Sequence, residues 1–441
     1  MKLTTKVIGS ALCLALVTYV LSPGLKLLRH DGSPWEWRNQ IISFSGVVAL
    51  YLMATTVGLS LRSPWLDRRI GLDQAYRLHR HLGISASVAA LLHWLVRQVP
   101  RWLVRFEIVK NPGDRMRGDY SRLEKVLYKL GLVLVEYAFY AAAVLVVIAL
   151  LRRVPYRLFR KTHRLLPGVF LVIAFHASTA PLRDRWFASP AGYLVVAVAL
   201  ASASGAFVAL FRRIGAARRM EGVVSSVDRY GALVDLEIEL RGASLEHEPG
   251  QFAFLRFAHD PEPHPFTIAG SKSNGSSLRF VVKGLGAFTN RLSSRVYVGE
   301  PVGVEGPYGS FVFNSSDRRQ AWVAGGIGIT PFLEKIAALA TSGTVQTSID
   351  LWYCTRSEDE GTFPSNLEAL CGLSGIRLHR MVAARGELFS AAYMREHIGD
   401  LGDVAVWFCG PDGFARSLRK DLQASGFDVD GSLHLEQFRF R

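Results

Sequence analysis

The sequence of 441 residues has little cysteine, and its cysteines are widely separated. The four of them, Cys13, Cys354, Cys371 and Cys409, include no Cys-x-x-Cys pair, so neither a disulfide framework nor a zinc site is predicted. Acidic residues are few, with 37 Asp and Glu against 52 Lys and Arg and a formal net charge of +15. We do not expect nucleic acid as a partner. The basic residues mostly flank apolar runs, where they set membrane topology and contact anionic lipid.

Charged side chains are nearly absent from six long apolar runs within residues 1–212, whereas residues 213–441 have the composition of a soluble protein. A membrane-spanning helix needs about 20 apolar residues. The runs of suitable length are roughly 5–22, 41–61, 74–98, 127–151, 162–180 and 190–212. The first run is followed by no small-x-small cleavage site, so we interpret it as a retained helix rather than a signal peptide. The sequence therefore predicts an α-helical membrane domain of six transmembrane helices over residues 1–214.

Acidic residues are missing from the loop at 152–164, which holds six basic ones. Basic residues also follow the second and the sixth runs, and all three regions lie on one side of a six-helix layout. Positively charged loops belong in the cytoplasm. The longer loop at 97–125, with eight basic and four acidic residues, opposes this orientation. We expect a multi-pass protein of the inner (plasma) membrane with both termini and the soluble half cytoplasmic.

Four histidines lie in the apolar runs as two pairs, His79 with His93 and His163 with His176. An imidazole inside a bilayer is costly, so intramembrane histidines indicate a function. At 1.5 Å of rise per residue, the two members of a pair lie about 20 Å apart along a helix. Two helices that run in the same direction would offer one ligand each at two depths, which suits two haems. His81 competes with His79 for the inner level, but its spacing of twelve from His93 turns it about 120° away.

The two pairs differ in their spacing. Fourteen residues return to within about 40° of the same helix face, whereas thirteen land about 220° around the helix. Pro167 removes the hydrogen bond to the carbonyl of His163, so we expect a break at Pro167-Gly168 that turns His176 toward the haem. Three arginines near the two levels would neutralise haem propionates or, equally, snorkel to the interface. They are Arg77, Arg80 and Arg97.

The soluble half changes its pattern twice. From about residue 218, short alternating runs such as Leu233–Ile238 and Phe252–Phe257 are separated by turns, which predicts a small antiparallel β-barrel. From residue 320, strands such as Ile349–Cys354 alternate with helical patterns, which predicts a parallel sheet with crossover helices. We expect the barrel over residues 215–315 and an α/β nucleotide-binding domain over residues 316–441.

Three loops of this half suit nucleotides. The loop Gly325-Gly326-Ile327-Gly328-Ile329-Thr330-Pro331 follows a strand and opens a helix, so its glycines would admit a pyrophosphate at a helix N-terminus. The loop Gly284–Thr289 follows the same logic. His264-Pro265-Phe266-Thr267 is a stiff extended segment whose hydroxyl and backbone would meet a flavin.

In this order, and followed by Cys409-Gly410-Pro411, the three loops resemble the ferredoxin-reductase-type flavoprotein module. With His79-Arg80-x-Leu82-Gly83 and the histidine pairs ahead of them, the chain resembles the NADPH oxidase and ferric reductase family over essentially residues 40–441. It is most similar to the compact bacterial members, which lack calcium-binding or other regulatory extensions. The combination is highly specific, although each motif alone is not.

The resemblance implies FAD, NADPH and two b-type haems as cofactors. The haem irons would be held by His79, His163, His93 and His176. Positions that match the flavin motifs are His264, Pro265, Phe266, Thr267, Gly286 and Thr289. Positions that match the nicotinamide dinucleotide loop and the Cys-Gly pair near the nicotinamide are Gly325, Gly326, Gly328, Thr330, Pro331, Cys409 and Gly410. Phe438 matches the closing aromatic that stacks on the flavin, and Phe440 competes for this role. We expect Cys409 and Phe438 to be the catalytic side chains. Ala269 stands where a serine is commoner, which removes one side-chain bond to the flavin.

Arg356 follows the strand that ends at Cys354-Thr355, where a guanidinium suits a 2′-phosphate, so we expect NADPH as the donor, with NADH possible. A plain surface arginine is the alternative. The resemblance implies hydride transfer from NADPH to FAD and single electrons onward through the inner and outer haems. Two imidazoles on each iron leave no open position, so the acceptor would be reduced at the haem edge. This suits oxygen reduced to superoxide. A ferric-chelate reductase and an electron donor to an extracytoplasmic partner protein stay open, and no obligate protein partner is expected.

Overall fold

The computed structural model describes residues 2–23, 34–110, 120–151, 153–211, 213–272, 274–313, 319–342, 348–361 and 363–436. The chain divides into two compact units. The first consists of the described residues up to Leu66 together with Gln74–Ile214. The second consists of Asp67–Asp73 and the described residues from Gly215 onward.

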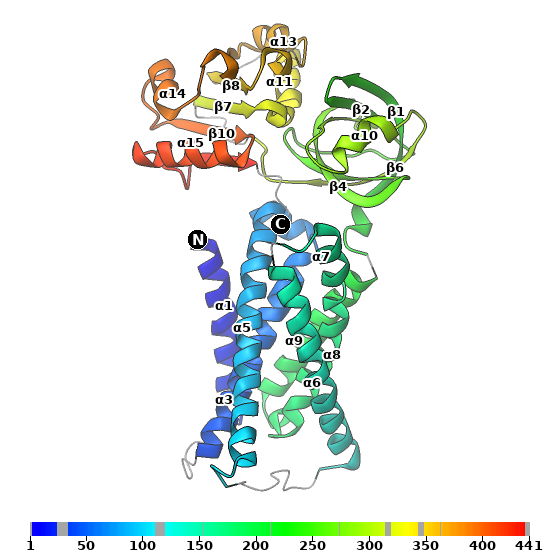
Figure 1. Ribbon diagram of the computed structural model, residues 1–441, viewed down its shortest axis with the longest axis vertical. Coiled ribbons are helices and arrows are strands. Elements are labelled where there is room, and N and C mark those ends of the chain that lie inside the picture. Colours follow the sequence, from blue (N-terminus) through cyan, green and yellow to red (C-terminus); the bar gives the residue numbers. More distant parts are fainter. Residues whose placement is uncertain are drawn as a thin grey trace. The chain divides into compact units, whose positions relative to one another are not determined.

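The first unit is helical and is coloured blue to green in Figure 1. Six candidate spans among the described residues are long and apolar enough to cross a membrane, which confirms the six predicted runs. The helices that form them are α1 (Lys2–Val20), α3 (Pro34–Ser60), α5 (Leu72–Arg105), α6 (Arg122–Leu150), α7 (Tyr156–His163) with α8 (Leu166–Thr179), and α9 (Pro190–Leu210). The short helix α4 (Pro64–Ile70) lies between α3 and α5 in the chain.

The fifth span is interrupted near the predicted position. Helix α7 ends at His163, two residues form a turn, and α8 begins at Leu166 with Pro167 in its first turn. The N–H of Leu165 donates to the carbonyl of Thr162 at 3.0 Å, which tightens the turn. The predicted break is therefore confirmed. His163 and His176 lie in one candidate span, Tyr156–Leu182, on either side of this break, His163 at the end of α7 and His176 in α8.

Small residues bring the helices of the first unit together. Helix α8 packs closely on α6 and α9, and α3 packs on α1 and α9. Ala191, Ala199 and Ala206 of α9 are fully buried in this core, beside Phe170 of α8. Within the described residues, α5 approaches none of the other long helices as closely.

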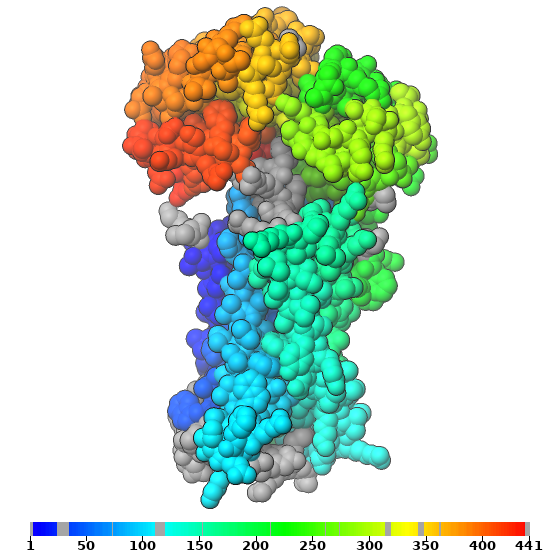
Figure 2. Space-filling view, viewed as in Figure 1, coloured from blue at the N-terminus to red at the C-terminus, as the bar shows by residue number. Residues whose placement is uncertain are grey.

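The outward faces of these helices are apolar. Helix α6 forms part of the cyan to turquoise surface in Figure 2. Its exposed apolar side chains include Leu123, Val126, Val133, Val144 and Val147. A continuous apolar face of this kind marks a surface that meets lipid or another protein rather than water. The chain is a multi-pass membrane protein.

The second unit begins with a closed antiparallel barrel, as predicted. Its strand order is β1-β2-β5-β4-β3-β6, and the barrel is green to yellow-green in Figure 1. The strands are β1 (Arg219–Tyr230), β2 (Leu233–Leu240), β3 (Phe252–Phe257), β4 (Asp260–Ser271), β5 (Ser277–Lys283) and β6 (Pro301–Tyr308), and α10 (Thr289–Arg295) follows β5. Alternate residues point inward, so Leu236, Ile238, Leu255, Ile268 and Phe280 are fully buried in the barrel core.

A five-stranded parallel sheet of order β11-β10-β7-β8-β9 follows the barrel, again as predicted. Its strands are β7 (Arg319–Gly325), β8 (Ile349–Thr355), β9 (Arg377–Val382), β10 (Val404–Cys409) and β11 (Leu433–Glu436). The helices are α11 (Thr330–Ser342), α12 (Glu358–Gly361), α13 (Leu367–Ser374), α14 (Ala391–Ile398) and α15 (Asp412–Ala424). Helices α11 and α13 pack on one face of the sheet, and α14 and α15 on the other (Figure 1).

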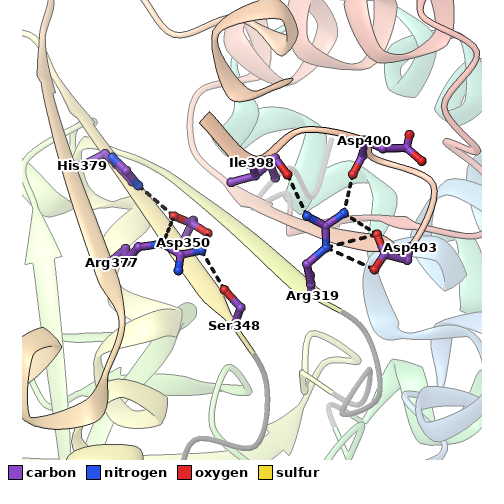
Figure 3. A network of polar contacts seen from close by, with 8 residues as sticks. All are labelled: Arg319, Ser348, Asp350, Arg377, His379, Ile398, Asp400 and Asp403. Carbon is purple, nitrogen blue, oxygen red and sulfur yellow. Dashed lines mark hydrogen bonds and ion pairs between the residues drawn. The ribbon is translucent and has the colours of Figure 1, made fainter. Parts of the chain in front are cut away.

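Ion pairs hold the amino-terminal edge of this sheet (Figure 3). Asp350 of β8 accepts hydrogen bonds from Arg377 at 2.8 and 2.5 Å and from Nε2 of His379 at 2.9 Å. Arg319 of β7 donates to the carboxylate of Asp403. Burial raises the pKa of Asp350, but the hydrogen bonds outweigh it and hold this pKa below its usual value. Ligands of open α/β sheets bind at the carboxyl ends of the strands, so this network is structural and lies at the opposite edge.

Candidate functional site

The inner pair of histidines comes together. His79 of α5 and His163 at the end of α7 face each other with ring centroids 6.1 Å apart, inclined at 73°. Because metal–imidazole bonds are about 2 Å long, two imidazoles on opposite sides of one iron have ring centres about 6 Å apart. The competing His81 is exposed. The geometry of His79 and His163 therefore fits a haem iron between them.

Hydrogen bonding prepares His79 as a ligand. Its Nδ1 lies 2.9 Å from the carbonyl of Thr56 on α3. A carbonyl can only accept, so Nδ1 carries the proton and Nε2 keeps its lone pair for a metal. The Nδ1 atoms of His163 and His176 are buried and have no hydrogen-bond partner among the described residues. A buried polar atom without a partner requires an explanation, and a bound group beside it is one.

The outer pair lies against two glycines of neighbouring helices. A Cβ at Gly46 of α3 would lie 3.1 Å from Cε1 of His93, so only glycine leaves this ring its space. A Cβ at Gly131 of α6 would meet the hydroxyl of Thr179 and, at 3.5 Å, the Cα of His176. His93 lies within electrostatic reach of His176, although no ring contact joins them in the described part of the chain.

Ser45 of α3 holds His93 in place. Its Oγ lies 3.1 Å from Nδ1 of His93 and 3.2 Å from the carbonyl of Ile42. The hydroxyl has one proton, which it donates to that carbonyl, so it accepts from His93 when Nε2 binds a metal. The carbonyl of Thr56 thus fixes the tautomer of His79, and the hydroxyl of Ser45 is compatible with the same tautomer at His93.

The candidate propionate partners differ in their surroundings. Arg97 lies 3.9 Å from Glu136 of α6, so its charge is matched within the protein. Arg77 and Arg80 are exposed at the other level. The structure thus gives Arg97 a counter-charge from the protein itself.

The two flavin motifs meet in the barrel. Strand β4 carries His264–Thr267, paired in register with Leu255–Phe252 of β3. The ring of His264 stacks on Phe288 with centroids 3.5 Å apart and planes 5° apart. Phe288 directly precedes Thr289, so this stack joins the His264–Thr267 segment to the loop Gly284–Thr289.

The loop before α10 is closed by one side chain. The hydroxyl oxygen of Thr289 accepts the N–H groups of Leu285 at 2.9 Å and of Gly286 at 3.0 Å. A Cβ at Gly286 would meet nothing within 4 Å, so the backbone here is open to a ligand. Pro265 and Phe266 lie in the paired part of β4, and Thr267 is buried. These residues fit a flavin nucleotide on the outside of the barrel.

The dinucleotide loop meets the Cys-Gly-Pro segment at the carboxyl edge of the parallel sheet. A Cβ at Gly325 would lie 2.8 Å from Pro411, and one at Gly328 would fall on the carbonyl oxygen of Cys409. Gly410 in turn leaves room for Gly325, whose Cα would lie 3.1 Å from a Cβ there. The two segments are about eighty residues apart in the sequence. Parallel strands β7 and β10 bring them together, because the carboxyl ends of such strands share one edge.

The remaining dinucleotide residues have distinct environments. Thr330 and Pro331 are buried at the start of α11, and the hydroxyl of Thr330 donates to the carbonyl of Ile327 at 3.0 Å. The Cys409 thiol is buried, which raises its pKa well above the usual value, and Glu436 adds to the shift. The thiol is therefore neutral, and it is suited to contact with a ring rather than to nucleophilic attack. Arg356 is exposed on the loop after β8.

Phe438 and its competitor Phe440 lie outside the described residues, as do residues 111–119 of the basic loop. The sequence analysis missed two charged residues at the dinucleotide loop, Lys283 and Glu360. Lys283 directly precedes Gly284, so its position beside a glycine loop was the only available signal. Glu360 carries no such signal, because it belongs to a run of acidic residues that is typical of a solvated surface.

A buried acid in the short helix α4, Asp67, had no signal in the sequence that pointed to a role. Asp67 lies 3.4 Å from Arg218 and accepts the N–H of Gly309 at 3.4 Å, within the second unit. Burial raises the pKa of this carboxyl despite both partners. Arg218 also donates to the carbonyl of Pro307 at 2.8 Å. A segment of the membrane half thus packs as part of the barrel.

Comparisons with known proteins agree with this division. Residues 45–174 match the ferric reductase like transmembrane component, and residues 224–312 match an FAD-binding domain. The anthranilate 1,2-dioxygenase electron transfer component of Acinetobacter baylyi is 23% identical over 49% of this chain and 65% of its own length. The propane 2-monooxygenase reductase component of Rhodococcus jostii is 25% identical over 43% of this chain and 55% of its own. The chain thus spans between half and two thirds of these relatives.

Solved structures with similar folds include flavohaem proteins. The FAD/NAD-binding domain of a nitric oxide dioxygenase from Vibrio cholerae is 23% identical, covering 49% of this chain and 97% of that one, with a TM-score of 0.44. A flavohaemoglobin from Malassezia yamatoensis is 15% identical, covering 90% of this chain and 96% of that one, with a TM-score of 0.48.

Proposed function

Because this chain joins a ferric-reductase-like transmembrane domain to an FAD-binding domain, as the ferric reductase and NADPH oxidase family does, we propose that it carries electrons from NADPH across a membrane. The two domains make it a transmembrane oxidoreductase. The donor, the two haems, and the outward direction from a cytoplasmic flavin domain through the plasma membrane belong to the proposal. It is supported most directly by His79 and His163, which two separate helices hold 6.1 Å apart.

The cofactors divide the chemistry between them. When bound, FAD would exchange a two-electron hydride for single electrons, and haem iron would carry the single electrons onward. The residues of this chain position these groups. His79 and His163 would hold the inner haem, and His93 and His176 the outer one. The carbonyl of Thr56 fixes the tautomer of His79, and the hydroxyl of Ser45 would accept from Nδ1 of His93 when Nε2 binds the iron.

The soluble unit would bind the flavin and the donor. Residues His264–Thr267 and the loop closed by Thr289 present backbone and hydroxyl groups to FAD. Gly325–Gly328 bring the backbone close to a dinucleotide, beside the neutral thiol of Cys409. Arg356 would contact the 2′-phosphate, which favours NADPH over NADH.

Oxygen is the acceptor we propose, with superoxide as the product. Two imidazole ligands on each iron leave no open position, which suits transfer of one electron from a haem edge. A ferric-chelate reductase would use the same residues. It is the second candidate function, because residues 45–174 match the ferric reductase like transmembrane component.

The acceptor is tested with purified protein. We expect NADPH oxidation accompanied by cytochrome c reduction that superoxide dismutase abolishes. Turnover that continues without oxygen only when a ferric chelate is added would assign the metal reductase instead. Faster turnover with an extracytoplasmic protein would point to a protein acceptor.

The haem ligands are tested by absorption spectroscopy. We expect a b-type haem spectrum from the wild-type protein. The variant His93→Leu should lose about half of this haem but keep reduction of FAD by NADPH. Wild-type protein with no b-type signal would contradict the proposal, and so would a folded variant that has lost both steps.

A further inference from the structure

A carboxylate and an ammonium group cover the dinucleotide loop. Lys283 is the last residue of β5 in the barrel, and Glu360 belongs to α12 of the nucleotide-binding domain. The two form an ion pair, with side chains only 23% and 17% exposed. The second carboxylate oxygen of Glu360 accepts the backbone N–H of Arg356 at 3.0 Å. Glu360 is therefore held by donors from two domains.

This pair lies directly on the second glycine of the loop. A Cβ at Gly326 would be 2.6 Å from Oε1 of Glu360 and 4.0 Å from Nζ of Lys283. Gly326 also has a φ of +55°, a conformation that side-chain-bearing residues rarely adopt. The surface that the missing side chain leaves open is thus filled by the carboxylate of Glu360.

That surface is where a dinucleotide loop meets its ligand. Glycines in such a loop allow the backbone to approach a pyrophosphate. The pyrophosphate is an anion and needs donors, and the donors next to Gly326 are Lys283 and the N–H of Arg356. In the described structure both already bind Glu360. A second anion cannot share them without repulsion between like charges.

We infer that Glu360 is an internal anion over Gly326, which the diphosphate of a bound nicotinamide dinucleotide displaces as it takes over Lys283. The inference rests on the proposed function, and it makes Glu360 and Lys283 residues that set affinity. Ligands without an anionic group at this position cannot replace the carboxylate, so the pair also selects against them. In the absence of ligand it keeps the ammonium of Lys283 paired.

The carboxyl is ionised under the conditions where it would compete. Burial raises the pKa of Glu360, but Lys283 and the N–H of Arg356 outweigh this effect and hold the pKa below its usual value. At neutral pH, Glu360 therefore carries a full negative charge. Its removal has to change the affinity for another anion at the same donors.

The test compares two glutamates of α12 in the full-length purified protein. Glu360→Gln removes the charge but keeps an oxygen that can accept from Arg356. Glu358→Gln removes the same charge from an exposed residue that pairs with Arg385 at 2.7 Å, away from Gly326. Binding of NADP⁺ is measured by calorimetry, and initial rates with NADPH and NADH give KM and kcat.

For Glu360→Gln we expect the dissociation constant of NADP⁺ and both KM values to fall by roughly three- to tenfold, with kcat within twofold of wild type. The KM values for NADPH and NADH should fall by the same factor, because both molecules contain the diphosphate. Glu358→Gln should match wild type. Lys283→Met should itself lower the affinity for the dinucleotide. In that background, Glu360→Gln should have little further effect on the affinity, because Glu360 competes with the diphosphate for the ammonium of Lys283.

Unchanged or weaker binding by Glu360→Gln would overturn the inference. A gain confined to NADPH would also overturn it, because the carboxylate would then compete with the 2′-phosphate. Full additivity with Lys283→Met would show that Glu360 does not act at this ammonium. Wild-type protein that binds no dinucleotide would overturn the proposed function as well, whereas normal wild-type binding with an inert Glu360→Gln overturns the inference alone.

Discussion

Substitution of Ser45 by alanine should raise the reduction potential of the outer haem that we propose His93 and His176 to hold. The hydroxyl of Ser45 donates to the carbonyl of Ile42 and accepts from Nδ1 of His93. An acceptor at Nδ1 makes the imidazole a stronger donor to the metal. A stronger donor stabilises the ferric state, which lowers the potential. Loss of the hydroxyl therefore favours the ferrous state.

The size of the shift follows from one hydrogen bond. A neutral intramolecular bond contributes about 0.5–1.5 kcal/mol. For one electron, about 59 mV corresponds to a tenfold change in equilibrium, or about 1.4 kcal/mol, so a bond that stabilised only the ferric state would lower the potential by about 20–60 mV. The carbonyl of Ile42 also interacts with His93 and would replace part of the lost bond. We therefore expect the lower part of this range.

The potentials are measured by spectroelectrochemical titration of the purified protein. Ser45→Ala should raise the midpoint of one haem by about 20–40 mV and leave the other unchanged. Ser87→Ala is the matched control, because the hydroxyl of Ser87 bonds only within α5, to the carbonyl of Gly83 at 2.7 Å. A downward shift, an equal shift of both haems or the same shift in the control would refute the reasoning.

Three further predictions concern the soluble unit. Gly328→Ala would place a Cβ on the carbonyl oxygen of Cys409, so we expect the KM for NADPH to rise more than tenfold. Gly413→Ala is the control, because its Cβ would meet nothing within 4 Å, and it should leave this KM unchanged. Thr289→Ala removes the acceptor of two backbone N–H groups, so FAD should bind about tenfold more weakly, and Thr289→Ser should restore binding in an FAD titration. The pKa of Asp350 is lower folded than unfolded, where it is about 3.9. Its contribution to stability is therefore complete above pH 4 and is lost as the pH falls through the folded value. Scanning fluorimetry should show a steeper acid loss of thermal stability for wild type than for Asp350→Asn, and identical profiles would contradict this.

The sequence predicts those features that depend on local periodicity. Runs of about 20 apolar residues define the spans, and Pro167 predicts the break because a proline has no N–H to donate. The meeting of Gly325 with Gly410 also follows from the sequence, since parallel strands place their carboxyl ends together. These features repeat general rules of backbone geometry. They need no knowledge of particular side-chain contacts.

Side-chain contacts between distant elements could not be predicted. The stack of His264 on Phe288 depends on how β4 lies beside the loop after β5. The ion pair of Lys283 with Glu360 joins two domains, and neither residue has a pattern that points to the other. The break after α7 was expected, but its position at Arg164-Leu165 depends on where the turn forms. Such details follow from tertiary packing rather than from propensity.

The buried carboxyl of Asp67 has a consequence for how the membrane half and the soluble half of this protein can recombine with those of its relatives. A soluble fragment that begins at Gly215 would lack the partner of Arg218 and of the Gly309 N–H. A flavin module taken from a relative would need an acceptable substitute for both. Recombination at the boundary near residue 215 is therefore not neutral, because the seven residues Asp67–Asp73, encoded with the membrane helices, belong to the second unit. A change at Asp67 in α4 acts on the soluble unit rather than on the helices that flank it in the chain.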